Sequence, residues 1–147
     1  MINISCQTDP VLDQPSRSNV IQASTSVFKS QKIKDCDVSL IFVSDEFLSD
    51  LKKKYFQKDH FTDVIAFRLN EYDELFIEGE IYISLQRAKE NAKTYNEPYA
   101  KEVSRLIIHG CLHLIGFEDK SKAGIKLMKQ MEEDLLKSTN WKNLFTS

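Results

Sequence analysis

Short runs of strand-forming residues fill the first half of the chain, and they limit the fold more than any other feature. Branched and aromatic side chains dominate three runs of strand length: 38–43, 64–67 and 75–83. Ile2, Ile4 and Cys6 alternate with polar residues and predict a further short strand. The polar segment 70–73 predicts a hairpin turn between the second and third runs. We therefore expect a small sheet, with the second half of the chain left for helices.

Helix signals lie between these runs and after them. Apolar residues at helical spacing predict helices from about residue 16, after residue 44, and over 84–95, 98–116 and 123–136. Ser44 is expected to cap the second helix, because Asp45 and Glu46 follow it where the helix dipole favours anions. The residues of this helix expected to face the core are Phe47, Leu48, Leu51 and Tyr55. Strands early and helices late predict an α+β domain with helices packed on a small sheet.

Length and composition predict one folded domain over residues 1–147, since 41% of the residues are hydrophobic and 29% are charged. No apolar run approaches the roughly 20 residues that span a bilayer, so no membrane partner is expected. The N-terminal residues lack the basic start and apolar core of an export signal, which makes the cytoplasm the expected location. Cys6, Cys36 and Cys111 are far apart, and we expect them to be free, buried thiols.

The near-neutral charge limits how the protein would handle nucleic acid. Twenty Lys and Arg against 22 Asp and Glu give a formal charge of −2, unlike the broadly basic surface of a dedicated nucleic-acid binder. An RNA partner would have to be held by a local patch. Residues 52–54 with Lys58 form the one compact basic run, which is explained more simply as a solvated helix face than as a phosphate-steering patch.

Two histidines in the predicted helix 98–116 form the most informative pattern. His109 and His113 are four residues apart, so their side chains lie on the same helix face one turn apart. Gly116 stands where a helix commonly ends in a conformation that only glycine adopts cheaply, and such a turn would bring Asp119 back toward the histidines. These offsets match the metzincin motif H-E-x-x-H-x-x-G-x-x-H with Asp in place of the last His. Gly110 replaces the general-base Glu, which disfavours a peptidase of that mechanism.

Two imidazoles and one carboxylate predict a divalent metal. This donor set suits Zn²⁺ in a three-ligand site with a fourth position for water, with nickel, cobalt or iron as rivals. Zinc lowers the pKa of its bound water to about 7 and so supplies hydroxide for hydrolysis. The alternative is a chance spacing of two core histidines. It is disfavoured because two of the three histidines in the chain lie here, followed by the Gly and the acid at these offsets. Cys111 points to nearly the opposite face and is expected in the core.

Three segments together also carry a family resemblance. Residues 109–117 contain His109, Gly110, Leu112, His113, Leu114, Gly116 and Phe117. The segments T-D-V-I-A-F at 62–67 and G-E-I-Y-I-S at 79–84 precede them in order. In residues, order and spacing, these segments resemble the YbeY family of bacterial metal-dependent endoribonucleases, which act in the maturation of ribosomal RNA, chiefly of the small subunit. The match covers roughly residues 38–137.

The resemblance implies a small mixed sheet flanked by helices, a metzincin-like zinc helix, and one zinc held by His109, His113 and Asp119. The third ligand is usually His in the family; a carboxylate would make the metal a weaker Lewis acid. Glu118 stands one position early for this role. The family commonly has Arg where this chain has Phe56, so a phosphate-binding guanidinium is absent at that position.

Other residues are expected to take part in catalysis or RNA contact. His109 and Arg105, which lies one helical turn before it and could reach either the cleft or a nearby carboxylate, are the candidate catalytic residues. Lys58 and Arg68 are candidates for RNA contact in place of the missing Arg, with Arg105 as a third possible substitute.

The leading interpretation is a zinc-dependent endoribonuclease specific for single-stranded RNA. It would process the 3′ end of small-subunit ribosomal RNA, with the small subunit or its assembly factors as partners. The rivals are a non-catalytic ribosome-assembly factor with a structural metal and another zinc-dependent hydrolase.

Overall fold

Four strands form one mixed sheet in the computed structural model, which describes residues 1–56 and 62–145. The strands are β1 (Ile2–Thr8), β2 (Cys36–Val43), β3 (Val64–Arg68) and β4 (Ile77–Ser84), in the order β1-β2-β4-β3. β1 and β4 both run parallel to β2, whereas β3 pairs antiparallel with β4 at the edge. The predicted strands and the hairpin between the last two are confirmed. Lys58, a candidate for RNA contact, lies outside the described residues.

Serine caps set the starts of several helices. The Ser16 hydroxyl accepts from the Asn19 amide, and Ser84 in the same way accepts from Arg87. Ser44 accepts from the amide of Phe47, as predicted from the acidic residues after it. The helices are α1 (Arg17–Ser30), α2 (Asp45–Phe56), α3 (Leu85–Tyr95), α4 (Tyr99–Ile115) and α5 (Lys122–Leu136), and the short 3₁₀ helix η1 (Trp141–Asn143) follows.

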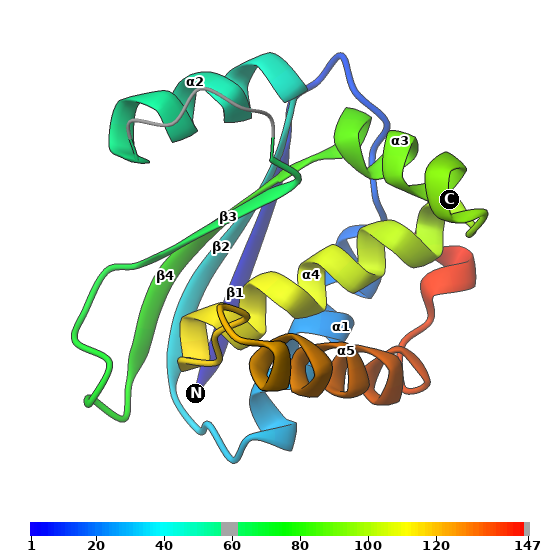
Figure 1. Cartoon of the computed structure of the whole chain (residues 1–147). Coiled ribbons are helices and arrows are strands. Elements are labelled where there is room, and N and C mark those ends of the chain that lie inside the picture. Colours follow the sequence, from blue (N-terminus) through cyan, green and yellow to red (C-terminus); the bar gives the residue numbers. More distant parts are fainter. Residues whose placement is uncertain (57–61, 146–147) are drawn as a thin grey trace.

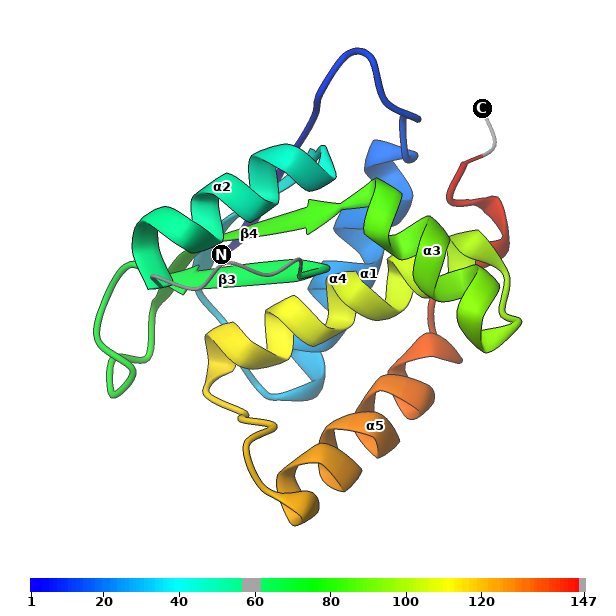
Figure 2. The same cartoon turned by 45° about the horizontal axis from the view of Figure 1, so that its top comes forward.

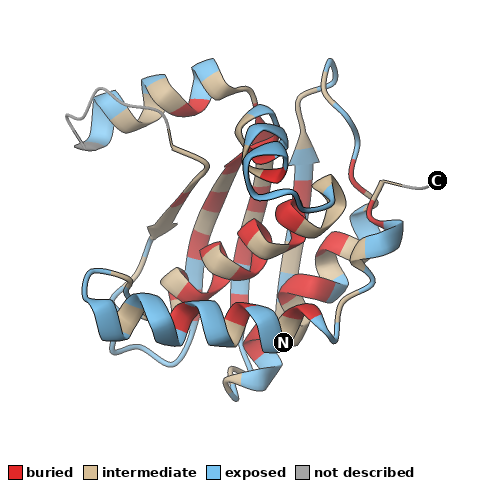
Figure 3. Ribbon diagram, turned by 45° about the vertical axis from the view of Figure 1, so that its right-hand side comes forward, coloured by how far each residue is buried: buried red, intermediate tan, exposed pale blue. Residues whose placement is uncertain are grey.

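The helices are divided between the two faces of the sheet (Figures 1 and 2). α1 and α4 cover one face and bury alternate residues of the central strands, such as Leu40 and Ile81. α2 lies against the opposite face, where Leu48 packs with Val43 and Ile65. α3 and α5 pack on α4, which is therefore the central helix of the larger layer (Figure 3).

Burial in α2 corrects part of the prediction. Leu48 is buried as expected and Leu51 is half-buried, but Phe47 and Tyr55 are about half exposed. Phe47 stacks on Tyr82 across the sheet surface, because α2 covers only the outer part of this face. The helical period was thus correct, and the width of the buried stripe was overestimated.

The strand boundary and the cysteines also test the sequence prediction. Leu75 and Phe76 precede β4 and are exposed, so the third run is shorter than expected. All three cysteines are buried and free, as predicted. Within the described ranges, no helix has the length and apolar character needed to cross a membrane.

Candidate metal centre

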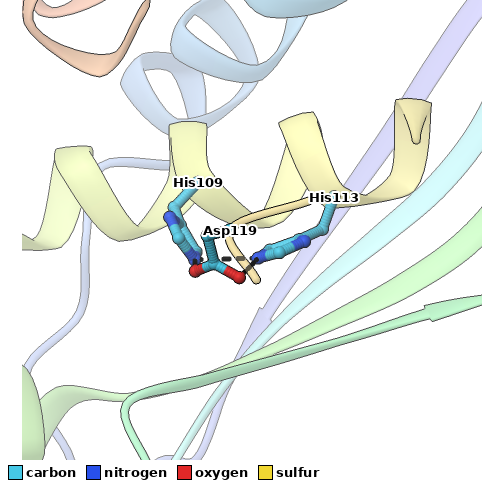
Figure 4. Close-up of side chains that lie close together, drawn as sticks. All are labelled: His109, His113 and Asp119. Carbon is cyan, nitrogen blue, oxygen red and sulfur yellow. Dashed lines mark hydrogen bonds and ion pairs between the residues drawn. The ribbon is translucent and has the colours of Figure 1, made fainter. Parts of the chain in front are cut away.

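One face of α4 and the loop after it bring three ligand-type side chains together. His109 and His113 project from consecutive turns of α4. Gly116 ends the helix with a φ of 122°, a left-handed value that favours glycine, and its amide donates to the carbonyls of Leu112 and His113. The chain then doubles back, which places Asp119 over the two imidazoles (Figure 4).

The distances within this cluster are short. His109 Nε2 lies 2.9 Å from His113 Nε2. The Asp119 carboxylate oxygens lie 3.6 Å from His109 Nε2 and 3.8 Å from His113 Nε2. Tetrahedral zinc with bonds of about 2.0–2.2 Å holds its ligand atoms about 3.3 Å apart. The separations in the cluster lie on both sides of this value, so its donor set and spacing fit one divalent ion.

The protonation of His113 also suits a metal ligand. Burial lowers the pKa of His113, and the neighbouring His109 lowers it further, while Asp119 opposes both effects. The neutral imidazole, which is the form that binds metal, is therefore favoured at neutral pH. The ligand side chains remain partly accessible, with exposed fractions of 17% for His109, 29% for His113 and 41% for Asp119.

A buried carboxylate that the sequence analysis did not single out contacts His109. Glu132 of α5 has a side chain only 3% exposed, and its Oε2 lies 2.6 Å from His109 Nδ1. Its other oxygen accepts from Arg105 at 3.0 Å. A signal was present in the sequence, because Glu132 follows Met128 by four residues and so shares the inward face of α5.

Arg105 bonds to carboxylates, one of the two destinations predicted for it, and it also lines the hollow among α3, α4 and α5. Its guanidinium makes two hydrogen bonds with Glu102, at 2.8 and 2.7 Å, besides the bond to Glu132. The hydrogen bonds with Glu102 are the main reason that the pKa of Arg105 is raised. Asn91 of α3 donates to Glu102 and to Asp63, which extends the network to the start of β3.

Gly110 explains why α4 lies so close to the sheet. A Cβ at this position would stand 2.6 Å from Cγ2 of Ile81 in β4. Gly110 stands where the metzincin motif has its general-base Glu, and here that position packs against the sheet. Cys111, next along the helix, is fully buried in the core, as predicted.

Two hollows meet at the cluster. The first, which we call the β3 cleft, has a volume of about 640 Å³ and is lined by residues of β3, by Lys52 and Tyr72, and by His113 and the loop 115–120. The second, which we call the α5 cleft, has a volume of about 560 Å³ and lies among α3, α4 and α5. His109 lines the α5 cleft, and Asp119 lines both.

Comparisons with known proteins agree with this geometry. A family model described as endoribonuclease YbeY matches residues 3–140. An endoribonuclease YbeY from Flavobacterium psychrophilum is 39% identical over 77% of this chain and 79% of its own length. That of Flavobacterium johnsoniae is 32% identical over 91% of this chain and 94% of its own length. The chain belongs to the YbeY family.

The fold of this YbeY family member also has a counterpart among solved structures. The solution structure of a Thermotoga maritima protein superposes with a TM-score of 0.62 at 30% identity, covering 94% of this chain and 91% of that one. The predicted mixed sheet flanked by helices is therefore confirmed.

Arg68, which was predicted to contact RNA in this YbeY family member, makes its hydrogen bonds with other residues of the protein. Its guanidinium donates to the carbonyl of Leu114 at 2.8 Å and to three carbonyls of the β3–β4 loop, those of Glu71, Glu74 and Phe76. Its Nε donates to the Asn70 side chain at 2.6 Å. These bonds give Arg68 a structural role, while contact with RNA stays a prediction. Glu118, the other acid of the motif, pairs with Lys120 and lies outside the cluster.

Proposed function

We propose that the protein is a metal-dependent endoribonuclease that cleaves single-stranded RNA and acts in the cytoplasm as one domain over residues 1–147. Its substrate would be ribosomal RNA near the 3′ end of the small-subunit RNA, with the small subunit or its assembly factors as partners. Membership of the YbeY family supports the RNA-cleaving activity. The observation that carries the proposal is the cluster of His109, His113 and Asp119 at the meeting point of two clefts.

The accessibility of this cluster favours catalysis over a purely structural metal. Structural zinc sites are closed by four protein ligands, whereas catalytic sites keep one position for water or substrate. Among the described residues, three ligand-type groups gather here, and they border open clefts. His109, His113 and Asp119 would hold the ion, zinc being the proposed one. When bound, the ion supplies Lewis-acid chemistry at a phosphate and lowers the pKa of bound water.

Side chains of the β3 cleft are suited to place an RNA strand. Lys52 of α2 and Lys120 of the loop after α4 both line it, and ammonium groups at these points attract phosphates. Tyr72 lines the same cleft with an exposed fraction of 59%, and its ring lies under the Arg68 guanidinium. An exposed aromatic ring is a stacking surface for an unpaired base. Lys52 and Lys120 are thus the proposed substitutes for the Arg that Phe56 replaces.

Cleavage of a labelled single-stranded RNA by metal-free and zinc-reconstituted protein tests the proposal. We expect cleavage at internal bonds by the zinc form and none after chelation. His113→Ala and Asp119→Asn should both lose zinc and cleavage. Asp134→Asn, an exposed acid of α5 that pairs with Lys137, is the matched charge control and should behave as wild type.

Each alternative predicts a different result. A structural metal predicts that the zinc form binds ribosomal subunits without cutting RNA, and that zinc removal unfolds the protein. Another hydrolase activity predicts zinc binding at the cluster with neither cleavage nor binding of RNA. Equal and negligible zinc in wild type and His113→Ala would remove the metal site itself.

A further inference from the structure

Glu132 is the most deeply buried charged group in contact with the cluster. Its side chain is 3% exposed, and its two oxygens are divided between His109 Nδ1 at 2.6 Å and an Arg105 nitrogen at 3.0 Å. Burial of a carboxylate is costly unless hydrogen bonds and opposite charge compensate it. Here Arg105 supplies the charge, and the contact with His109 uses the remaining oxygen.

The atom that Glu132 contacts determines what the contact does. His109 presents Nε2 to His113 and Asp119, and only Nδ1 is directed to α5. A carboxylate at Nδ1 holds the proton on that nitrogen, which leaves Nε2 with its lone pair directed into the cluster. It also fixes the rotation of the ring and makes the Nε2 lone pair a stronger ligand for a metal ion.

From this geometry we infer that Glu132 is a positioning residue for His109, held in place by Arg105, and that it sets the affinity of the cluster for a divalent cation. Arg105 acts on His109 through Glu132. Its bidentate contact with Glu102, which is also on α4, fixes the position of the guanidinium. Arg105 would therefore be a positioning residue and not a group that touches RNA. This inference rests on the proposed metal site.

Zinc affinity without RNA separates this role from catalysis. We would measure the zinc dissociation constant of purified protein by competition with a chelating dye. Glu132→Gln keeps the size of the side chain and one acceptor oxygen but loses the charge, and we expect affinity to fall about 10-fold. Glu132→Ala removes the acceptor oxygen as well as the charge. Its zinc affinity should fall by close to 100-fold, the upper range for loss of a group that hydrogen-bonds to a metal ligand.

Two control variants separate positioning from general stability. Glu102→Gln weakens the anchor of Arg105 without touching His109 or Glu132, so we expect a loss of zinc affinity clearly smaller than the loss in Glu132→Gln. Glu133→Gln removes an exposed charge from the next position of α5 and should leave affinity unchanged. Near-ultraviolet circular dichroism of each metal-free variant checks that the fold is retained.

Nitrogen NMR of the His109 ring measures which ring nitrogen carries the proton. A merely structural role of Glu132 would leave this tautomer unchanged. Wild type should have its proton on Nδ1, whereas Glu132→Ala should show a mixture of the two tautomers. Wild-type affinity in Glu132→Gln and Glu132→Ala, or an equal loss in Glu102→Gln, would overturn the inference and leave the metal site standing. A wild-type protein that binds no zinc would overturn the metal site, and the inference with it.

Discussion

Replacement of Gly110 by alanine tests whether the close approach of α4 to the sheet positions the cluster. The added Cβ would stand 2.6 Å from Ile81 Cγ2, 3.3 Å from Ile81 Cδ1 and 3.4 Å from Val64 Cγ2. Ile81 is fully buried in β4, which has β2 on one side and β3 on the other. Because interiors are packed as densely as crystals, Ile81 has little room to move, and the helix must shift instead.

Two opposing contributions decide the size of the effect. Alanine in place of glycine favours a helix by about 1 kcal/mol. Overpacking of a well-packed core costs about 1–3 kcal/mol, and this contact is tighter than real Cβ contacts allow. The upper part of that range applies, since the obstruction is a branched methyl group within a central strand. We therefore expect Gly110→Ala to lower the free energy of unfolding by about 1–2 kcal/mol.

Urea unfolding of metal-free protein measures this change, and zinc titration follows its effect on the cluster. A shift of α4 moves His109 relative to Glu132 on α5, so zinc affinity should fall as well. A double-mutant cycle with Ile81→Ala removes the methyl group that obstructs the Cβ. The double variant should be more stable than the two single changes predict by addition. A Gly110→Ala protein as stable as wild type, or additive effects in the cycle, would refute the reasoning.

Three further predictions concern residues outside the cluster. Arg68→Ala should lower the free energy of unfolding by about 2–3 kcal/mol in urea, because several carbonyls lose a charged donor; a changed salt dependence of RNA binding would instead reveal a phosphate contact. Burial raises the pKa of the Cys111 thiol to about 12, so the thiolate form is scarce at pH 8.5. Native protein should then leave this thiol unreacted with dithionitrobenzoate until it is unfolded, and rapid labelling of Cys111 would contradict its burial. Lys52→Ala with Lys120→Ala should reduce the slope of log affinity for single-stranded RNA against log salt by about 1.4; an unchanged slope would place the strand elsewhere.

Features determined by neighbouring residues were predicted well from the sequence. The cap at Ser44 and the turn at Gly116 depend on the few residues around them. The same holds for the cluster, because His109, His113 and Asp119 lie within one helix end and the loop after it. A positive φ at a glycine and a four-residue spacing are sufficient to bring these groups together.

Features that depend on distant segments could not be predicted in this way. Glu132 reaches His109 only because α5 packs against α4, and the sequence indicates the inward face of α5 but not what that face meets. The partners of Arg68 within the protein lie in the next loop and at the end of α4, and the sequence around Arg68 indicates neither contact. The exposure of Phe47 and Tyr55 depends on how much of the sheet α2 covers, which no helical period specifies.

The position of Asp119 at the border of both clefts has a consequence for the shape of a substrate. A site at the bottom of a single pocket accepts the end of a chain. A site that borders two hollows does not require a free terminus to be threaded, because the β3 cleft and the α5 cleft both open on the cluster. Space on both sides of the cluster suits cutting within a strand, whereas a single closed pocket suits trimming from an end.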